Sequence, residues 1–292
     1  MAKLKAADIT AVKAQGFLLN RGTELFSGRI VAPGTVFTAE NFKDMAELAN
    51  TFGNGKLICT SRLAVEIPGI PFEKIPEARQ FASDHGMRFG GTGGKVRPVT
   101  ACKGTTCVYG NYDTQALAKK IHEDYYLGWD QVKLPHKFKI AVGGCPNNCV
   151  KPDLNDLGVI GQRIPVVDLE KCRGCKKCQV ELNCPIKVAK VVDGKVFIDP
   201  AQCNHCGRCK GKCLFNAISY ENGYKIYIGG RWGKKTAMGK PLSKIFTTED
   251  EVMEVVEKAI CLFRDEGIQG ERFADTVNRL GMEYVEQKLL GE

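Results

Sequence analysis

The sequence predicts an α+β fold in which a small cysteine-rich domain is inserted into a larger one. Segments with helical spacing of apolar residues are mixed with short alternating segments that are typical of strands. The chain has 292 residues, 43% of them hydrophobic, which is enough for one large domain or two modest ones. Residues 165–218 hold eight of the 14 cysteines and many lysines, and they show little helical periodicity.

The N-terminal part is expected to contain two helices and a strand. Thr38 can cap the first helix and Gly53 can end it, and Pro68 is expected to end the strand. The predicted elements are a helix over 39–52, a strand over 56–67 and a helix over 73–85. The glycine-rich stretch over 90–94 predicts a flexible joint, and it lacks the GxGxxG spacing of a dinucleotide site.

The following part begins with a helix that Asp113 caps and that ends at Gly128. A short strand over 137–142 leads into a glycine pair and a cysteine. Beyond the insert, a capping box over 248–251 begins an amphipathic helix that runs to about residue 266. The predicted domains are an N-terminal α+β half-domain over 1–94, a second domain over 95–163 and 222–292, and the insert over 164–221.

Charge and hydropathy restrict the partners. The formal net charge is +9, but Lys and Arg form no dense run, so we expect no nucleic-acid partner. No apolar run approaches the roughly 20 residues of a membrane helix, and the start of the chain lacks the apolar stretch of a signal peptide. We therefore expect a cytoplasmic protein without a membrane partner. A basic chain suits anionic cofactors and a small anionic substrate.

Eight cysteines of the insert form two CxxCxxC triplets, each followed by a single cysteine. Disulfides are not expected in a reducing cytosol. A two-residue gap lets one tight loop present thiolates to neighbouring corners of a four-iron cluster, and the remote cysteine usually serves the other cluster. The spacing predicts one cluster on Cys172, Cys175, Cys178 and Cys213, and a second on Cys203, Cys206, Cys209 and Cys184. Zinc knuckles are the alternative, but two triplets plus two single cysteines fit iron–sulfur clusters better.

Four further cysteines form two separated pairs. Four residues lie between Cys102 and Cys107, and three lie between Cys145 and Cys149. Four thiolates in two pairs can hold one more cluster. By spacing alone, two buried pairs without a ligand remain an alternative.

Three motifs resemble the siroheme sulfite and nitrite reductases. They are Val96-Arg97-Pro98-Val99-Thr100-Ala101-Cys102, Leu134-Pro135-His136-Lys137-Phe138-Lys139 and Gly143-Gly144-Cys145-Pro146-Asn147-Asn148-Cys149. The segments Thr60-Ser61-Arg62 and Gly229-Gly230-Arg231-Trp232-Gly233 are similar to other parts of that family. The resemblance begins near residue 20 and is greatest to anaerobic sulfite reductase C subunits. It implies a siroheme-binding repeat with an N-terminal ferredoxin-like half-domain and an inserted two-cluster ferredoxin domain.

The resemblance also implies roles for individual residues. Cys102, Cys107, Cys145 and Cys149 would hold a four-iron four-sulfur (4Fe–4S) cluster, and the Cys149 thiolate would also be the axial ligand of siroheme iron. Arg62, Arg97, Lys137 and Lys139 would surround the substrate. Thr106 and Asn147 would touch the macrocycle, and Arg231 and Lys234 would bind its carboxylates. The cofactors implied for the whole chain are siroheme and three 4Fe–4S clusters.

The activity implied is the six-electron reduction of sulfite to sulfide, with electrons arriving through the two insert clusters. Lys137 and Lys139 together favour sulfite over nitrite, because the nitrite enzymes tend to have asparagine at the second position. The alternatives are a siroheme nitrite reductase subunit, an iron–sulfur electron-transfer protein without siroheme, which would not need the four cations, and a scaffold without activity. Expected partners are sulfite or nitrite, electron-donor subunits or a ferredoxin, and a second copy of the chain.

Overall fold

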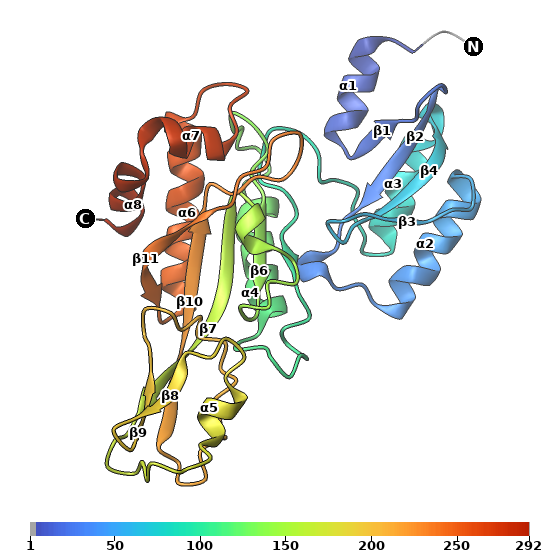
Figure 1. The fold of residues 1–292 in the computed structure, drawn as a ribbon. Coiled ribbons are helices and arrows are strands. Elements are labelled where there is room, and N and C mark those ends of the chain that lie inside the picture. Colours follow the sequence, from blue (N-terminus) through green and yellow to red (C-terminus); the bar gives the residue numbers. More distant parts are fainter. Residues whose placement is uncertain (1–3, 292) are drawn as a thin grey trace.

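The computed structural model describes residues 4–291, which form an N-terminal half-domain, a central domain and a projecting insert (Figure 1). No helix within these residues is both long and apolar enough to cross a lipid bilayer.

The N-terminal half-domain is a four-stranded antiparallel sheet with helices packed on it. The strands are β1 (Phe17–Leu19), β2 (Leu25–Ile30), β3 (Ile58–Cys59) and β4 (Val65–Pro71), in the order β1-β2-β4-β3. The helices are α1 (Ala6–Ala14), α2 (Ala39–Phe52) and α3 (Ile75–Asp84). Ile67 and Ile70 of β4 belong to the same buried cluster as Met45 and Leu48 of α2, so this unit has a core of its own.

The central domain is a five-stranded mixed sheet in the order β11-β10-β7-β6-β5. Its strands are β5 (Thr100–Ala101), β6 (Ile140–Gly143), β7 (Leu157–Val167), β10 (Ile218–Ile228) and β11 (Lys240–Phe246). Strands β5, β6 and β7 are mutually parallel, whereas β10 and β11 run antiparallel to their neighbours. The helices are α4 (Thr114–Ile121), which continues as a π-helix (His122–Leu127), α6 (Glu249–Glu266), α7 (Phe273–Leu280) and α8 (Met282–Leu290).

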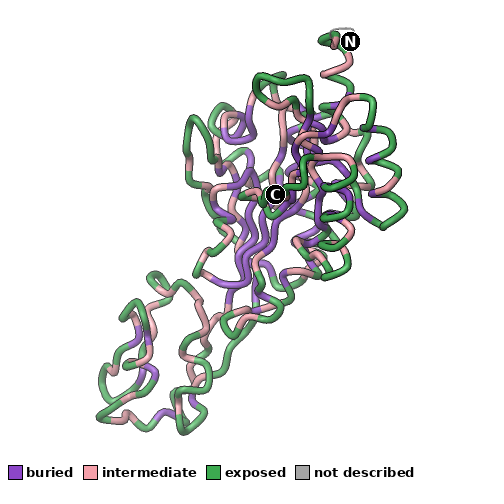
Figure 2. Tube along the Cα trace, turned by 90° about the vertical axis from the view of Figure 1, so that its right-hand side faces the viewer, coloured by how far each residue is buried: buried purple, intermediate pink, exposed green. Residues whose placement is uncertain are grey.

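The insert lies at the far end of the two longest strands. β7 and β10 pair over their whole length, from Leu157–Ile228 to Val167–Ile218. The segment between them contains α5 (Gln179–Asn183) and the hairpin of β8 (Ala189–Val192) and β9 (Lys195–Ile198). Figure 2 shows that this segment projects from the body and contains little buried chain. The exact domain boundaries given above remain predictions.

The local signals for helices are confirmed. The Thr38 side chain accepts from the Asn41 N–H in a capping box at α2, and Thr248 does the same with Glu251 at α6. The Asp113 side chain accepts from the Ala116 N–H at 2.9 Å and begins α4. Each hydroxyl or carboxylate satisfies a backbone donor that the first helical turn leaves free.

The predicted strand over 56–67 is wrong in its extent. The segment turns at Leu63, which has a φ of 59°, so that β3 and β4 form a hairpin. Pro68 lies inside β4 and does not end it. It is tolerated because the register between β2 and β4 shifts at this point, so a missing N–H breaks no regular ladder bond.

Two further predictions need correction. The strand predicted over 137–142 begins only at Ile140. Lys137 and Lys139 therefore lie in the segment before the strand. The stretch over 90–94 is not a free joint, because Gly90 and Gly91 are buried. The Gly91 N–H donates to the Tyr126 hydroxyl at 3.0 Å, and the Gly91 carbonyl accepts from Arg29 Nη1 at 2.9 Å.

Candidate functional site

Four cysteines from two distant segments line a single cavity. Cys102, Cys107, Cys145 and Cys149 all border a space of about 470 Å³. Cys102 directly follows β5 and Cys145 lies just beyond β6. Since β5 and β6 are parallel neighbours, their carboxyl ends meet and bring the two cysteine pairs together. The Gly144 N–H donates to Cys102 Sγ at 3.2 Å and fixes this approach.

Glycines let the two cysteine segments touch through their backbones. A Cβ at Gly110 would lie 1.9 Å from the Gly104 carbonyl oxygen. A Cβ at Gly104 would lie 2.6 Å from Thr114 Cγ2, and one at Gly144 would lie 3.1 Å from Gly104 Cα. Any other residue at Gly110 or Gly104 would therefore distort the loop that carries Cys102 and Cys107, and one at Gly144 would push the two cysteine segments apart.

The donor set of this cavity fits a polynuclear cluster. Burial raises the pKa of Cys145, and the neighbouring Cys102, Cys149 and Cys107 thiols raise it further. Four thiolates so close together need a positive partner, which iron in a 4Fe–4S cluster supplies. Within residues 4–291, no three His, Cys, Asp or Glu side chains converge on a point that fits a single metal ion. The thiols instead surround a space.

The four predicted cations line one neighbouring cavity of about 340 Å³. Its wall includes Arg62, Arg97, Lys137 and Lys139, which come from three separate segments of the chain. Arg29 also lines it and was not predicted. Arg29 pairs with Glu66 at 2.6 Å, so its charge is partly balanced.

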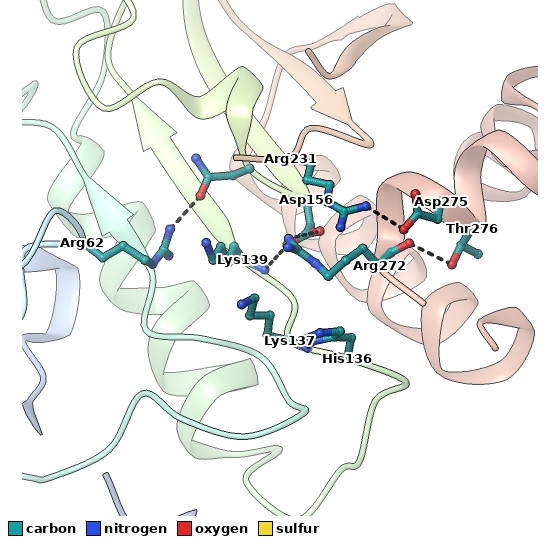
Figure 3. Close-up of polar contacts among 10 residues, drawn as sticks. Arg62, His136, Lys137, Lys139, Asp156, Arg231, Arg272, Asp275 and Thr276 are labelled. Atoms are coloured by element: carbon teal, nitrogen blue, oxygen red, sulfur yellow. Dashed lines mark hydrogen bonds and ion pairs between the residues drawn. The ribbon is translucent and has the colours of Figure 1, made fainter. Parts of the chain in front are cut away.

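Hydrogen bonds fix the direction of the two arginines. Arg62 donates from Nη1 to Asn155 Oδ1 at 2.7 Å and from Nη2 to the Pro98 carbonyl at 2.9 Å. Arg97 donates from Nη1 to the Gly91 carbonyl, and its backbone N–H donates to the Phe138 carbonyl at 2.8 Å. Figure 3 shows Arg62 and the two lysines directed toward a common region.

Burial and neighbouring cations lower the pKa values of two side chains in this cavity. The pKa of Lys139 is lowered to about 8 by burial and by Arg62, Arg272 and Lys137, whereas Asp156 acts in the opposite direction. Burial also lowers the pKa of Arg62 to about 10. A lysine with such a pKa can give up a proton near neutral pH.

A third cavity, of about 320 Å³, shares walls with both of the others. It shares Ser61, Arg62 and Lys139 with the cation cavity. It shares Leu63, Cys149 and Val150 with the thiol cavity. Its remaining wall includes Lys151, Leu154, Asn155 and Trp232. We call it the middle cavity, because one side faces the thiols through Cys149 and the other faces the cations.

Of the other residues predicted to contact the cofactor, one lines one of these three cavities and three do not. Asn147 lines the thiol cavity. Thr106 is exposed and its hydroxyl donates to the Lys103 carbonyl at 3.4 Å. Arg231 is paired with Asp275 at 2.8 Å, and Lys234 is exposed. In the segment over 229–233, Trp232 is the residue that lines the middle cavity.

The insert cysteines are also gathered. Burial, together with the Cys203, Cys206 and Cys184 thiols, raises the pKa of Cys209 to about 11, which places the distant Cys184 near the second triplet. Cys172 and Cys184 both lie in the small core of the insert, with Cys178, Cys209 and Cys213 packed against it. All eight are free thiols rather than disulfides.

The insert contacts the main domain near the thiol cavity. The guanidinium carbon of Arg208 lies 4.6 Å from the centre of the Tyr109 ring, and Tyr109 lines that cavity. The Arg163 N–H donates to the His205 carbonyl at 2.8 Å. The second triplet is therefore the part of the insert that is held against the main domain.

Sequence reasoning missed a buried ion pair beside the cations. Arg272 Nη2 donates to both carboxylate oxygens of Asp156 at 2.9 Å. The Asp156 side chain is fully buried and that of Arg272 is 7% exposed. The two residues are 116 positions apart, so no local pattern in the sequence indicates the pair.

Comparisons with known proteins agree with this architecture. The family described as nitrite and sulphite reductase 4Fe–4S domain matches residues 92–292. The nitrite/sulfite reductase ferredoxin-like half domain matches residues 19–81.

Two curated relatives illustrate the similarity. The coenzyme F420-dependent sulfite reductase of Methanocaldococcus jannaschii is 30% identical over 258 residues, which are 85% of this chain but 39% of that protein. The C subunit of the anaerobic sulfite reductase of Salmonella typhimurium is 28% identical over 256 residues, covering 81% of this chain and 73% of that relative.

Solved structures share the fold. Dissimilatory sulfite reductase I superposes with a TM-score of 0.73 at 24% identity, over 91% of this chain and 69% of that one. The NirA protein of Mycobacterium tuberculosis gives a TM-score of 0.68 at 15% identity, over 99% of this chain and 48% of that one. Because the two family matches together span most of the sequence, the chain belongs to the nitrite and sulphite reductase family.

Proposed function

We propose that this chain reduces sulfite to sulfide with six electrons, at a siroheme coupled to a 4Fe–4S cluster. The observation that supports this most strongly is the row of three cavities with shared walls. Thiols line the first, cations line the last, and Cys149 faces both the first and the middle one. A row of this kind suits a path from an electron store to a bound anion.

The residues present suit the two groups. Cys102, Cys107, Cys145 and Cys149 would hold the cluster, and Cys149 would reach the siroheme iron as well. The middle cavity combines apolar walls, such as Leu63 and Trp232, with cationic ones, and this suits a flat macrocycle that carries carboxylates. When bound, siroheme supplies the iron at which the sulfur–oxygen bonds are broken.

The cations bind the substrate and supply protons. Arg62 and Arg97 remain charged and offer fixed forks of N–H donors to the oxygens of sulfite. Lys139, with a pKa of about 8 caused by burial and neighbouring cations, holds a proton on Nζ at neutral pH and can pass it to an oxygen that leaves as water. Their fields act most strongly where burial removes water, as it does around Arg62.

Electron entry is proposed to occur through the insert. Its eight cysteines would hold two further 4Fe–4S clusters, and the second triplet lies next to the main domain. Electron-donor subunits or a ferredoxin would reduce these clusters, in line with the relative from Salmonella typhimurium, which is one subunit of a reductase. We also propose that a second copy of the chain contributes cations to the site.

Turnover with sulfite tests the proposal directly. The purified chain is supplied with chemically reduced methyl viologen under anaerobic conditions, and oxidation of the dye is followed with sulfite and with nitrite. We expect sulfide as the product and a higher kcat/KM for sulfite. Equal loss of dye electrons with and without either anion would contradict the proposal, and a preference for nitrite would indicate a nitrite reductase.

A further inference from the structure

Two adjacent residues just before β7, Asn155 and Asp156, hold two cations of the site, Arg62 and Lys139. Asn155 Oδ1 accepts from Arg62 Nη1 at 2.7 Å, while its Nδ2 donates to the Lys151 carbonyl at 2.9 Å. Asp156 Oδ2 accepts from the backbone N–H of Lys139 at 2.8 Å. Figure 3 shows Asp156 in contact with both Lys139 and Arg272.

The segment is placed by topology. β6 and β7 are parallel and paired at Ile140 and Leu157, so their amino ends lie side by side. Lys139 directly precedes β6, and Asp156 directly precedes β7. The Leu157 N–H donates back to the Lys139 carbonyl at 3.1 Å. The backbone of Lys139 is thereby held on both sides.

Asp156 is a buried carboxyl group whose pKa is raised by burial, against the opposing effects of Arg272 and the Lys139 N–H. A buried carboxylate is costly unless it is paired and hydrogen-bonded. Arg272 supplies the pair, but the Arg272 Nε is itself buried and lacks a hydrogen-bond partner in the described part of the chain. Such pairs contribute little net stability compared with apolar residues of the same volume. The position that Asp156 gives to Lys139, and the charges that the pair places near it, give a physical reason for keeping the Asp156–Arg272 pair.

We propose that Asn155 and Asp156 are positioning residues for the reaction, and that the Asp156–Arg272 pair sets the charge on Lys139. Asn155 holds the Arg62 fork in one direction, and Asp156 holds the backbone from which the Lys139 side chain projects. This inference rests on the proposed function, in which Arg62 and Lys139 bind the anionic substrate.

The sign of the effect on Lys139 is fixed by the two charges. The Asp156 carboxylate raises the pKa of Lys139, and the Arg272 guanidinium lowers it. The charged groups that face Lys139 or line its two cavities are Arg62, Lys137, Arg272, Asp156, Arg29, Arg97, Lys13 and Lys151. Asp156 is the one carboxylate among them, so its loss is not compensated by another acid of this set.

The first test measures the ionisation of Lys139 in the full-length protein. NMR titration of labelled lysine side chains, with Lys139 assigned through Lys139→Arg, follows its pKa in the wild type and in two variants. We expect Asp156→Asn to lower the pKa and Arg272→Gln to raise it. If Asp156→Asn does not fold, the double variant Asp156→Asn with Arg272→Gln removes both charges and keeps an amide pair, and its pKa should lie between those of the wild type and Arg272→Gln.

Glu271→Gln is the matched control. It removes an ion pair with Arg279 from the residue next to Arg272 without touching the cavity, so it should leave the pKa of Lys139 unchanged. Shifts of the same sign in the two charge variants, or no shift in folded protein, would overturn the role of the pair.

The second test addresses Asn155. Asn155→Leu keeps the volume but removes the acceptor for Arg62, and we expect KM for sulfite to rise about tenfold with a smaller change in kcat. Asn155→Asp restores an acceptor and should recover most of the affinity. If the wild-type protein turns over sulfite and Asn155→Leu leaves KM unchanged, the positioning role is contradicted. Wild-type protein without sulfite turnover would instead contradict the proposed function, and the Lys139 titration would still decide the present inference.

Discussion

At the scale of single residues, the proposed chemistry relies on cations that hydrogen bonds hold in place. Arg62 and Arg97 each donate to a backbone carbonyl, and Arg62 also donates to Asn155. Burial lowers the pKa values of Arg62 and Lys139 because it disfavours the charged forms. An anion that enters this cavity therefore meets cations that have already lost much of their hydration.

The pH dependence of turnover should report Lys139. Its ammonium group is charged below a pKa of about 8 and neutral above it, so turnover should fall as the pH rises through about 8. Lys139→Ala should lower kcat by about 100-fold or more, because a positioned proton donor contributes about that much. Lys139→Arg should also be slow, but without the fall near pH 8, since arginine stays charged.

The measurement is kcat and KM for sulfite over the range of about pH 6 to 10. Lys133→Ala provides the control, because Lys133 is exposed and lies outside the cavity walls described above. A fall near pH 8 that persists in Lys139→Arg would assign the titration to another group.

The residue motifs predicted part of this site. The structure brings Arg62, Arg97, Lys137 and Lys139 into one cavity, and their contact with the substrate remains a prediction. Arg29, Asn155, Asp156 and Arg272 were missed, because their relation to the site depends on contacts between distant segments. The Arg231 side chain is bound to Asp275, which gives no support to its expected contact with a cofactor.

At the scale of elements, the parallel strands bring the residues of the candidate site together. The carboxyl ends of β5 and β6 bring the two cysteine pairs together, and the amino ends of β6 and β7 bring Lys139 beside Asp156. Helix caps such as Thr38 and Thr248 could be predicted because the signal lies within four residues. The long pairing of β7 with β10 could not, since the insert separates the two strands in sequence.

Gly110→Ala tests the tight loop that carries Cys102 and Cys107. The added methyl group would lie 1.9 Å from the Gly104 carbonyl oxygen, so this loop must change shape. We expect the protein to lose the cluster of the main domain and to keep those of the insert, with a fall of about four irons per chain. Iron and acid-labile sulfide analysis measures this.

Gly22→Ala is the control for that variant. It places a methyl group at a positive φ of 74°, a strain that Gly110→Ala does not carry, but meets no atom within 4 Å. It should keep its full iron content. Full iron content in Gly110→Ala would show that the loop carrying Cys102 and Cys107 holds its cluster despite the distortion, contrary to our expectation.

At the scale of the whole molecule, the fold arranges three parts around one route. The half-domain contributes Arg62 and Arg29 to the cation cavity, the central domain contributes Arg97, both lysines and the thiols, and the insert is held against the thiol cavity at Tyr109. Figures 1 and 2 show why the insert suits contact with a donor: it projects from the body, and its surface remains accessible.

We propose that one chain holds a siroheme next to a cluster and receives electrons through two more clusters. The most direct test is anaerobic purification followed by an absorption spectrum and by iron and acid-labile sulfide counts. Our account predicts siroheme absorption bands together with about twelve cluster irons and about one haem iron per chain. If the protein contains iron and sulfide but shows no siroheme bands, even after reconstitution with siroheme, the proposal is contradicted and an electron carrier is indicated.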